Sequence, residues 1–158
     1  MTTRVGMGFD VHPFSDDANR ALVLGGVVID GERGLAGHSD ADVIAHAVAD
    51  ALLGAAGLGD LGTLFPASDQ AWAGADSIGL LEDVARRVHD AGWQPVNVDT
   101  AVVLEAPKLA PHRKAMEDRL SQAAGCDVTV KPKRAEGLGA IGRGEGVACW
   151  AVALVERR

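Results

Sequence analysis

The stretch from Ser39 to Gly57 constrains the fold more than any other part of the chain. It is rich in Ala, Leu and Val and ends at a glycine, which predicts a helix with Ser39 as its N-cap. Apolar residues occupy nearly its whole circumference, at positions 43, 44, 47, 48, 51, 52 and 55. A helix that is apolar on almost every side is buried, so the rest of the chain must surround this one.

Three polar residues interrupt the apolar helix at four-residue spacing: Asp42, His46 and Asp50. This spacing places them in one stripe along the helix. Carboxylates and imidazoles are costly to bury unless they are paired, hydrogen-bonded or bound to a metal ion. A metal ligand supported by neighbouring acids satisfies all three groups, so we predict that His46 binds a metal.

The other metal ligands are predicted near the N-terminus, in the sequence Gly-Phe-Asp10-Val-His12-Pro. Residues 4–11 predict a strand, and Asp10 and His12, two residues apart, leave the same face of it. Two imidazoles and one carboxylate leave the fourth position of a tetrahedral metal open, as catalysis on an anionic substrate requires. The alternative is that the two histidines are ordinary hydrogen-bonded residues in separate places.

The remaining pattern predicts a single α+β domain over residues 1–158. Strands are expected at 4–11, 21–29, 96–104, 128–131 and 146–155, and helices at 39–57, 76 or 77 to about 92, and 111–125. This order favours a mixed sheet of four to five strands with helices packed on one face. Two long connections, 58–74 and 136–146, are expected to be ordered and functional.

Charge and composition argue against several classes of partner. The net charge of -7 and the lack of a basic stripe argue against a general nucleic-acid or anionic-membrane surface. No apolar run is long enough to span a bilayer, and no signal-peptide pattern is present, so we expect a cytoplasmic protein without a membrane partner. Cys126 and Cys149 are isolated in the sequence and are expected to be reduced thiols.

Five motifs occur in order along the chain: Asp10-x-His12, His38-Ser39-Asp40-x-Asp42, Gly-Asp60-Leu-Gly62, Ala106-Pro107-Lys108 and Gly142-Arg143-Gly-Glu145-Gly. Together they make the chain resemble the 2-C-methyl-D-erythritol 2,4-cyclodiphosphate synthase family from about residue 4 to residue 155. The resemblance implies a lyase of the non-mevalonate (MEP) isoprenoid pathway. Such an enzyme converts 4-diphosphocytidyl-2-C-methyl-D-erythritol 2-phosphate to the cyclic diphosphate and CMP by intramolecular phosphoryl transfer. It also implies a homotrimer with active sites between neighbouring subunits.

The same resemblance assigns the metal ions and the first catalytic group. It implies zinc at Asp10, His12 and His46, and magnesium or manganese at Glu136 when substrate is bound. His38 matches a residue beside the substrate phosphates, and we expect it to stabilise the transition state. No protein nucleophile is required, because metal ions and fixed donors neutralise the charge of the transferred phosphoryl group.

The predicted substrate contacts also follow from the resemblance. Ser39 matches a phosphate contact, and Asp60, Leu61 and Gly62 match the surroundings of the methylerythritol hydroxyls. Further along the same connection, substrate contacts are also expected from Phe65, Pro66, Ala67, Ser68 and Asp69. The cytidine is expected in a loop made of Leu104, Glu105, Ala106, Pro107, Lys108, Leu109 and Ala110. Arg143 matches a further ligand contact, although it could instead pair with Glu145.

The chain departs from the family in front of Glu136. A Thr-rich run is common there, and Pro132-Lys133-Arg134-Ala135 stands in its place. One of those threonines is thought to stabilise the transition state. We therefore expect Lys133 or Arg134 to supply a cation to the diphosphate, with Lys133 as a substrate contact and Arg134 as a catalytic residue.

Two rival functions are compatible with the predicted metal site. A metal-dependent phosphohydrolase would use the metal to activate water. Such sites often carry an adjacent His-Asp pair, and the only His-Asp dipeptide, His89-Asp90, is far from the metal motifs in sequence. A trimeric, metal-stabilised binding protein would bind the ligand tightly without turnover.

Overall fold

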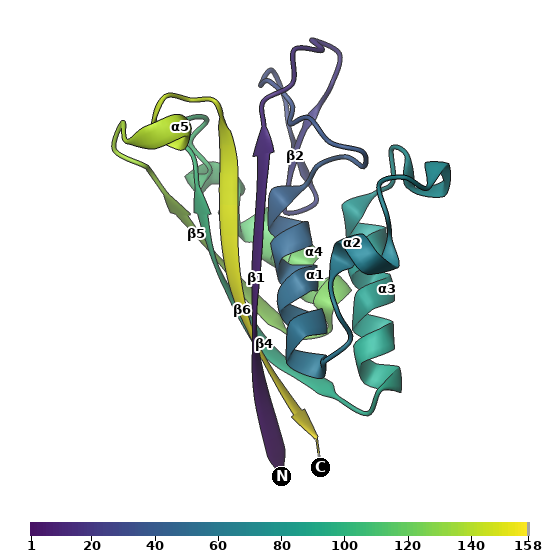
Figure 1. The fold of residues 1–158 in the computed structure, drawn as a ribbon. Helices are drawn as coiled ribbons and strands as arrows, with labels where there is room; N and C mark the ends of the chain where they lie inside the picture. Colours follow the sequence, from purple (N-terminus) through teal and green to yellow (C-terminus); the bar gives the residue numbers. More distant parts are fainter. Residues whose placement is uncertain (158) are drawn as a thin grey trace.

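A four-stranded mixed sheet with three long helices on one face forms the body of the computed structural model, which describes residues 1–157 (Figure 1). The strands are β1 (Thr2–Pro13), β4 (Gln94–Val103), β5 (Asp127–Lys133) and β6 (Gly146–Arg157), in the order β1-β6-β4-β5. β6 pairs antiparallel with β1 and β4, and β4 pairs parallel with β5. Therefore β1, β4 and β5 run in one direction and end at the same end of the sheet. The predicted α+β class and mixed sheet are confirmed.

The helical layer consists of α1 (Val43–Ala56), α3 (Ser77–Asp90) and α4 (Arg113–Ala124). The two long connections are ordered, and they contain the short helices α2 (Leu61–Leu64) and α5 (Gly139–Gly142) and the 3-10 segment η1 (Gln70–Trp72). A further 3-10 segment, η2 (Ala110–His112), leads into α4. Cys126 and Cys149 are free thiols, as predicted. Over the described chain, no helix combines the length and apolar character that crossing a membrane requires.

Two glycines on β1 allow α1 to lie directly on the sheet. Exposure alternates along the strand, so that Gly6 and Gly8 face the helix. A Cβ atom on Gly6 would lie 2.1 Å from the carbonyl oxygen of Ala51, and one on Gly8 would lie 1.9 Å from that of Ala47. Any larger residue would push the helix away, because the atoms it meets belong to the backbone. These glycines therefore fix the distance between β1 and α1.

The segment 21–29 is a hairpin, and the prediction of a single strand there is wrong. It forms β2 (Leu22–Leu24) and β3 (Val27–Ile29), which pair antiparallel in a separate small sheet. Gly25 and Gly26 connect them with φ angles of 57° and 73°. Two consecutive residues with positive φ reverse the chain in a two-residue turn, and glycine adopts this conformation at low cost.

Asp42 is the N-cap of α1, and the prediction of Ser39 at that position is wrong. The Asp42 carboxylate is fully buried and accepts hydrogen bonds of 2.6–3.2 Å from four backbone N–H groups, those of Gly25, Gly26, Ile44 and Ala45. Burial raises the pKa of Asp42 to about 6 against the opposing effect of these donors, so the carboxylate is ionised at neutral pH. Asp42 thus joins the hairpin turn to the start of α1.

Replacing Asp42 by Ala is expected to lower the free energy of unfolding by about 3–5 kcal/mol, because four N–H groups lose their buried, charged acceptor. Asp76→Ala is the matched control. Asp76 caps α3 at the surface, where its side chain accepts the N–H of Ile78, and its loss is expected to cost about 1 kcal/mol. Urea unfolding measures both variants. Equal losses would show that Asp42 acts only as a helix cap.

On the face of the sheet opposite the three long helices, β1 and β6 form an apolar patch. Its exposed apolar side chains, each at least 44% accessible, are Val5, Met7, Phe9, Val11, Trp150 and Val152. The rings of Phe9 and Trp150 lie 5.0 Å apart between centroids, so the patch continues from β1 onto β6. A contiguous apolar surface of this kind is typical of an interface between protein molecules.

Candidate metal centre and neighbouring cavities

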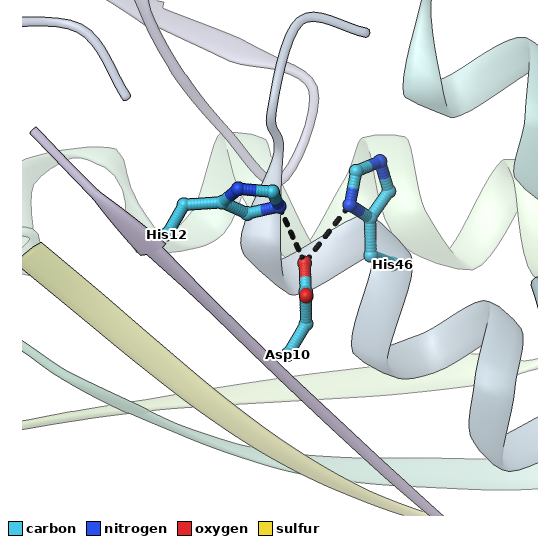
Figure 2. A group of neighbouring side chains, drawn as sticks. All are labelled: Asp10, His12 and His46. Carbon is cyan, nitrogen blue, oxygen red and sulfur yellow. Dashed lines mark hydrogen bonds and ion pairs between the residues drawn. The ribbon is translucent and has the colours of Figure 1, made fainter. Parts of the chain in front are cut away.

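Asp10, His12 and His46 converge between β1 and α1, as predicted (Figure 2). Oδ2 of Asp10 lies 3.0 Å from Nε2 of His12 and 2.9 Å from Nδ1 of His46. One ligand atom from each residue lies within 4.8 Å of the other two. Asp10 and His12 leave the same side of β1, and the close approach of α1 at Gly8 brings His46 to them.

The hydrogen bonding of His12 fits a metal ligand. Nδ1 lies 2.9 Å from the carbonyl oxygen of Ala36, which can only accept, so Nδ1 carries the proton of the neutral ring. Nε2 is then an acceptor, and it is buried without a hydrogen-bond partner in residues 1–157. It nevertheless faces a carboxylate oxygen of Asp10, which is also an acceptor. A cation between the two satisfies both, which favours a metal site over separate, ordinary histidines.

The charges around the centre favour a bound cation. Burial alone would raise the pKa of Asp10, but the adjacent rings of His12 and His46 hold that pKa well below its usual range. Burial also opposes protonation of His46, yet the carboxylate of Asp10 raises the pKa of the ring. Asp10 is therefore ionised, and its negative charge attracts positive charge to the point that the three residues share.

A cavity of about 270 Å³ opens beside the three ligands. Its lining includes six of the predicted catalytic and substrate-contacting residues, namely His38, Ser39, Leu61, Gly62, Phe65 and Ala67. Asp50, the last member of the polar stripe on α1, also lines it and accepts the N–H of Leu61 at 2.6 Å. Burial raises the pKa of Asp50, as do the nearby negative charges of Asp60 and Asp10. This hydrogen bond ties α2 to α1 at the edge of the cavity.

Sequence reasoning missed Trp72 and Leu80 in the lining of this cavity. Trp72 stands in a long connection and is one of only three tryptophans in the chain, a signal that could have identified it. Its ring packs edge-on against Phe65, with centroids 4.8 Å apart. Leu80 gave no comparable signal, because it reads as an ordinary apolar position of a helix.

Four further predicted contacts from the same connection, Asp60, Pro66, Ser68 and Asp69, do not line the cavity. Asp60 caps α2 by accepting the N–H and the hydroxyl of Thr63. Asp69 caps η1, and its carbonyl oxygen accepts a hydrogen bond of 3.0 Å from Nε2 of His38. Pro66 and Ser68 lie beside them without lining the cavity. His38 is thus held in place by the connection opposite it.

A second cavity, of about 280 Å³, lies where β4 and β5 end. It is lined by the predicted residues Leu104, Glu105, Pro107, Lys108, Leu109, Ala110, Lys133 and Arg134, together with Pro132, and Ala106 belongs to the same loop. The guanidinium of Arg134 pairs with Glu105 at 2.9 Å, and it lowers the pKa of that carboxyl. The other oxygen of Glu105 accepts the N–H of Ala135 at 2.7 Å.

The two cavities lie at opposite edges of the sheet in a single chain. The candidate metal ligands come from α1 and β1, whereas the second cavity is formed at β4 and β5. β6 and β4 stand between β1 and β5, so the outer strands are three strand spacings apart, about 14 Å. Both cavities nevertheless lie toward the same end of the sheet, because β1, β4 and β5 run in one direction.

Glu136 and Arg143, predicted as a metal ligand and a ligand contact, line neither cavity. Glu136 is exposed just after β5 and lies outside the group formed by the three metal ligands. Arg143 pairs with Glu145 at 2.6 Å, as in the alternative considered from the sequence. A single chain therefore does not bring all the predicted site residues together.

Comparison with known sequences gives matches along the whole chain. The model of the YgbB family matches residues 3–156. The 2-C-methyl-D-erythritol 2,4-cyclodiphosphate synthase of Rubrobacter xylanophilus is 55% identical, over 98% of this chain and 95% of that protein. The synthase of the same description from Bordetella petrii is 54% identical, over 98% of this chain and 96% of that protein.

Solved structures of similar proteins have the same fold. A 2C-methyl-D-erythritol-2,4-cyclodiphosphate synthase in a CDP-bound form has a TM-score of 0.86 at 38% identity, covering 97% of this chain and 100% of that one. A CDP complex from Plasmodium falciparum gives 0.84 at 32% identity, covering 99% and 97%. The bifunctional IspDF of Campylobacter jejuni gives 0.93 at 39% identity, and this chain corresponds to 43% of that longer protein.

Proposed function

The chain belongs to the YgbB family and acts as a 2-C-methyl-D-erythritol 2,4-cyclodiphosphate synthase of the MEP pathway, and we propose that two neighbouring copies build each of its active sites. This lyase converts 4-diphosphocytidyl-2-C-methyl-D-erythritol 2-phosphate to the cyclic diphosphate and CMP. The observation that carries the proposal is the separation of the metal cavity and the second cavity in one chain. Family membership decides against the two rival functions, hydrolysis and binding without turnover.

Zinc is the ion proposed for Asp10, His12 and His46, since two imidazoles and one carboxylate suit it and leave a position for a phosphate oxygen. When bound there, the ion supplies Lewis-acid polarisation of that oxygen. The carbonyl oxygen of Ala36 accepts a hydrogen bond from Nδ1 of His12, which leaves Nε2 as the atom that would bind the ion. Glu136 is proposed to hold magnesium or manganese together with a substrate bound between subunits, in keeping with its exposed position outside the zinc ligands.

The chain's own residues would position two phosphates for an intramolecular transfer. The 2-phosphate attacks the β-phosphorus and CMP leaves, so catalysis depends on orientation and charge neutralisation. His38, held through Asp69, is proposed to stabilise the transition state, and Ser39 to contact a phosphate. The wall formed by Asp60 to Asp69 is proposed to receive the methylerythritol, and the loop from Leu104 to Ala110 the cytidine. Arg143 is proposed as a further ligand contact that must exchange its pairing with Glu145.

We also propose that the protein assembles as a homotrimer. Packing the apolar outer faces of three sheets together would bury the patch that includes Met7 and Trp150, which a single chain leaves exposed. In a closed threefold ring of chains, the β1 edge of one chain also lies beside the β5 edge of the next. The metal cavity of one chain would then meet the second cavity of its neighbour.

Two inactive variants are expected to restore activity to each other if sites are shared. His46→Ala removes a metal ligand, and Ala110→Trp fills the second cavity, where Ala110 is exposed. Each variant alone is expected to be nearly inactive. Mixed trimers, refolded from equal amounts, should regain about one quarter of the unmixed wild-type rate, because one site in four pairs an intact metal cavity with an intact second cavity. Phosphorus NMR of the cyclic diphosphate measures the rate, and a mixture without activity would place the whole site within one chain.

Lys133 fits the predicted role of a cation that precedes Glu136 and contacts the diphosphate. Both Lys133 and Arg134 line the second cavity, and Arg134 is paired with Glu105. Within residues 1–157, Lys133 has no carboxylate partner, so its charge is available to a diphosphate. Arg134 is proposed as the catalytic residue that acts together with it.

Changing Lys133 and Arg134 together to Thr is expected to lower kcat about 10–100-fold, the value of a lost charge-assisted hydrogen bond. Lys131→Thr is the control, since Lys131 lies on the same strand but pairs with Asp99 outside the cavity. Steady-state assays with the diphosphocytidyl substrate compare the two. Full activity in the double variant would remove both residues from the mechanism.

The cytoplasm is the compartment proposed for this enzyme. The free thiols of Cys126 and Cys149 are in keeping with a reducing environment. The net charge of -7 supports the expectation that neither nucleic acid nor a membrane is a partner.

A further inference from the structure

His46 is contacted at both nitrogens of its ring. Nδ1 faces Oδ2 of Asp10 at 2.9 Å, on the side of the proposed metal. Nε2 faces the hydroxyl oxygen of Ser77 at 2.8 Å, on the opposite side of the ring. Ser77 is the first residue of α3 and is only 1% exposed. A neutral imidazole carries one proton, so the ring can ligate through Nδ1 only if that proton is on Nε2.

Asp40 determines the direction of the hydrogen bond between Ser77 and His46. Oδ1 of Asp40 accepts the hydroxyl proton of Ser77, and Oδ2 accepts the backbone N–H of Ser77 at 3.0 Å. An ionised carboxylate can only accept, so the single hydroxyl hydrogen of Ser77 points to Asp40. The oxygen of Ser77 then accepts from Nε2–H of His46. The lone pair of the ring is left on Nδ1, directed at the metal position.

The loop before α1 holds Asp40 in place from two further sides. Oδ1 of Asp40 also accepts the N–H of Asp42 at 3.1 Å, and the backbone N–H of Asp40 donates to the carbonyl of Ala75 at 3.1 Å. These contacts fix Asp40 between the N-terminal ends of α1 and α3. The carboxylate can therefore act as a rigid end point for the hydrogen-bonded chain.

Ser39 offers a second hydroxyl group to the ring, but no carboxylate fixes its direction. Its oxygen lies 3.2 Å from Nε2 of His46 and 3.5 Å from that of Ser77, and it accepts the N–H of Ala41 at 3.2 Å. The shorter contact to Ser77 already requires a proton on Nε2, so Ser39 cannot donate there. Its hydroxyl hydrogen is free for a phosphate in the adjacent cavity.

We propose that Asp40 and Ser77 are positioning residues that hold His46 as its Nε2–H tautomer and so aim Nδ1 at the metal. This inference rests on the proposed metal site. The pair complements the carbonyl of Ala36, which fixes the opposite nitrogen of His12. The two histidines thereby ligate through different nitrogens, and each is oriented by an acceptor on its far side. Such outer partners of metal-bound histidines typically change metal affinity by 10–100-fold when they are removed.

Asp10 faces Nδ1 of His46 at 2.9 Å, and in metal-free protein this carboxylate would itself hold a proton on Nδ1. The tautomer set by Ser77 is therefore read in a metal-free Asp10→Ala chain, by long-range 1H–15N NMR at a pH above the titration of the ring. Asp10→Ala is expected to show Nε2–H. Adding Asp40→Ala removes the acceptor of the Ser77 hydroxyl, which can then donate to Nε2, so the Nδ1–H form of His46 is expected to become populated. If Asp40 only stabilised the fold, its replacement would not move the proton of His46 from one ring nitrogen to the other.

Zinc affinity is the second measurement, by competition with a chromophoric chelator. Ser77→Ala and Asp40→Ala are expected to bind zinc 10–100-fold more weakly, and Ser77→Thr, which keeps the hydroxyl, should retain most of the wild-type affinity. Asp76→Asn is the control, because it alters the cap of the same helix without touching His46. Its affinity should match that of the wild type.

Three results distinguish the inference from its premise. An Nδ1–H ring in metal-free Asp10→Ala, or a tautomer that does not change when Asp40→Ala is added together with unchanged zinc affinity in Asp40→Ala, would overturn the relay. A larger loss of affinity in Ser39→Ala than in Ser77→Ala would also overturn it and assign the orienting role to Ser39. A wild-type chain that binds no zinc would overturn the proposed metal site, whereas the relay would still be decided by the tautomer in metal-free Asp10→Ala.

Discussion

A His12→Ala variant is expected to lose tight zinc binding and to form the cyclic diphosphate at least about 10³-fold more slowly than the unchanged chain. The substitution removes one of three ligands, and the buried Nε2 that it deletes has no other partner within residues 1–157. A metal ion contributes several kcal/mol to stabilising charge in a phosphoryl transfer. Each 1.36 kcal/mol corresponds to a factor of ten in rate, which gives the expected loss.

Phosphorus NMR of the substrate with zinc and magnesium measures this loss through the paired signals of the cyclic diphosphate. His89→Ala is the control, since His89 is exposed near the C-terminal end of α3 and is remote from the ligands in sequence. It should retain full activity and full zinc content. A His12→Ala protein with normal turnover and stoichiometric zinc would show that the ion is held elsewhere.

Gly8→Ala is expected to destabilise the protein by about 3 kcal/mol or more and to weaken zinc binding at the same time. The added Cβ would lie 1.9 Å from the carbonyl oxygen of Ala47 and 2.7 Å from the nitrogen of Ala51. Both are backbone atoms of α1, so no rotation of a side chain can relieve the contact. The helix must move away from β1, which carries His46 away from Asp10 and His12.

Gly54→Ala is the control that tests whether replacing a glycine by alanine is by itself enough to destabilise the protein. Gly54 is an exposed position of α1, and a Cβ there would meet nothing closer than 3.9 Å. This variant is expected to be more stable by about 0.5–1 kcal/mol, because alanine favours the helix. Thermal and urea unfolding of both variants, with zinc titrations, provide the comparison. If Gly8→Ala were as stable as the wild type, β1 and α1 would not be held together by this close contact.

The local sequence was sufficient to predict most of the long elements and the grouping of Asp10, His12 and His46. A helix apolar nearly all round must be buried, and the cost of burying His46 points to a metal. Side-chain alternation in a strand has a strict period of two, so Asp10 and His12 had to share a face. These inferences hold because they depend on spacing within one element.

Errors arose where a residue's role depends on a partner distant in sequence. Ser39 and Asp42 are both good helix caps, and the choice of Asp42 follows from the N–H groups of Gly25 and Gly26, which the hairpin brings to it. The same two glycines divide the segment 21–29, whose apolar run otherwise reads as one strand. Propensity cannot distinguish these outcomes, because tertiary contacts override it.

The sequence alone was enough to predict the buried helix, the three candidate ligands and, through its ordered motifs, the family. The tertiary structure was needed to show how close α1 comes to β1 and which groups face each ring nitrogen of the two histidines. It also showed that the metal cavity and the second cavity lie at opposite edges of one sheet. The reason is physical: spacing along a chain fixes directions within an element, whereas distances between elements and the direction of a hydrogen bond depend on groups that only packing brings together.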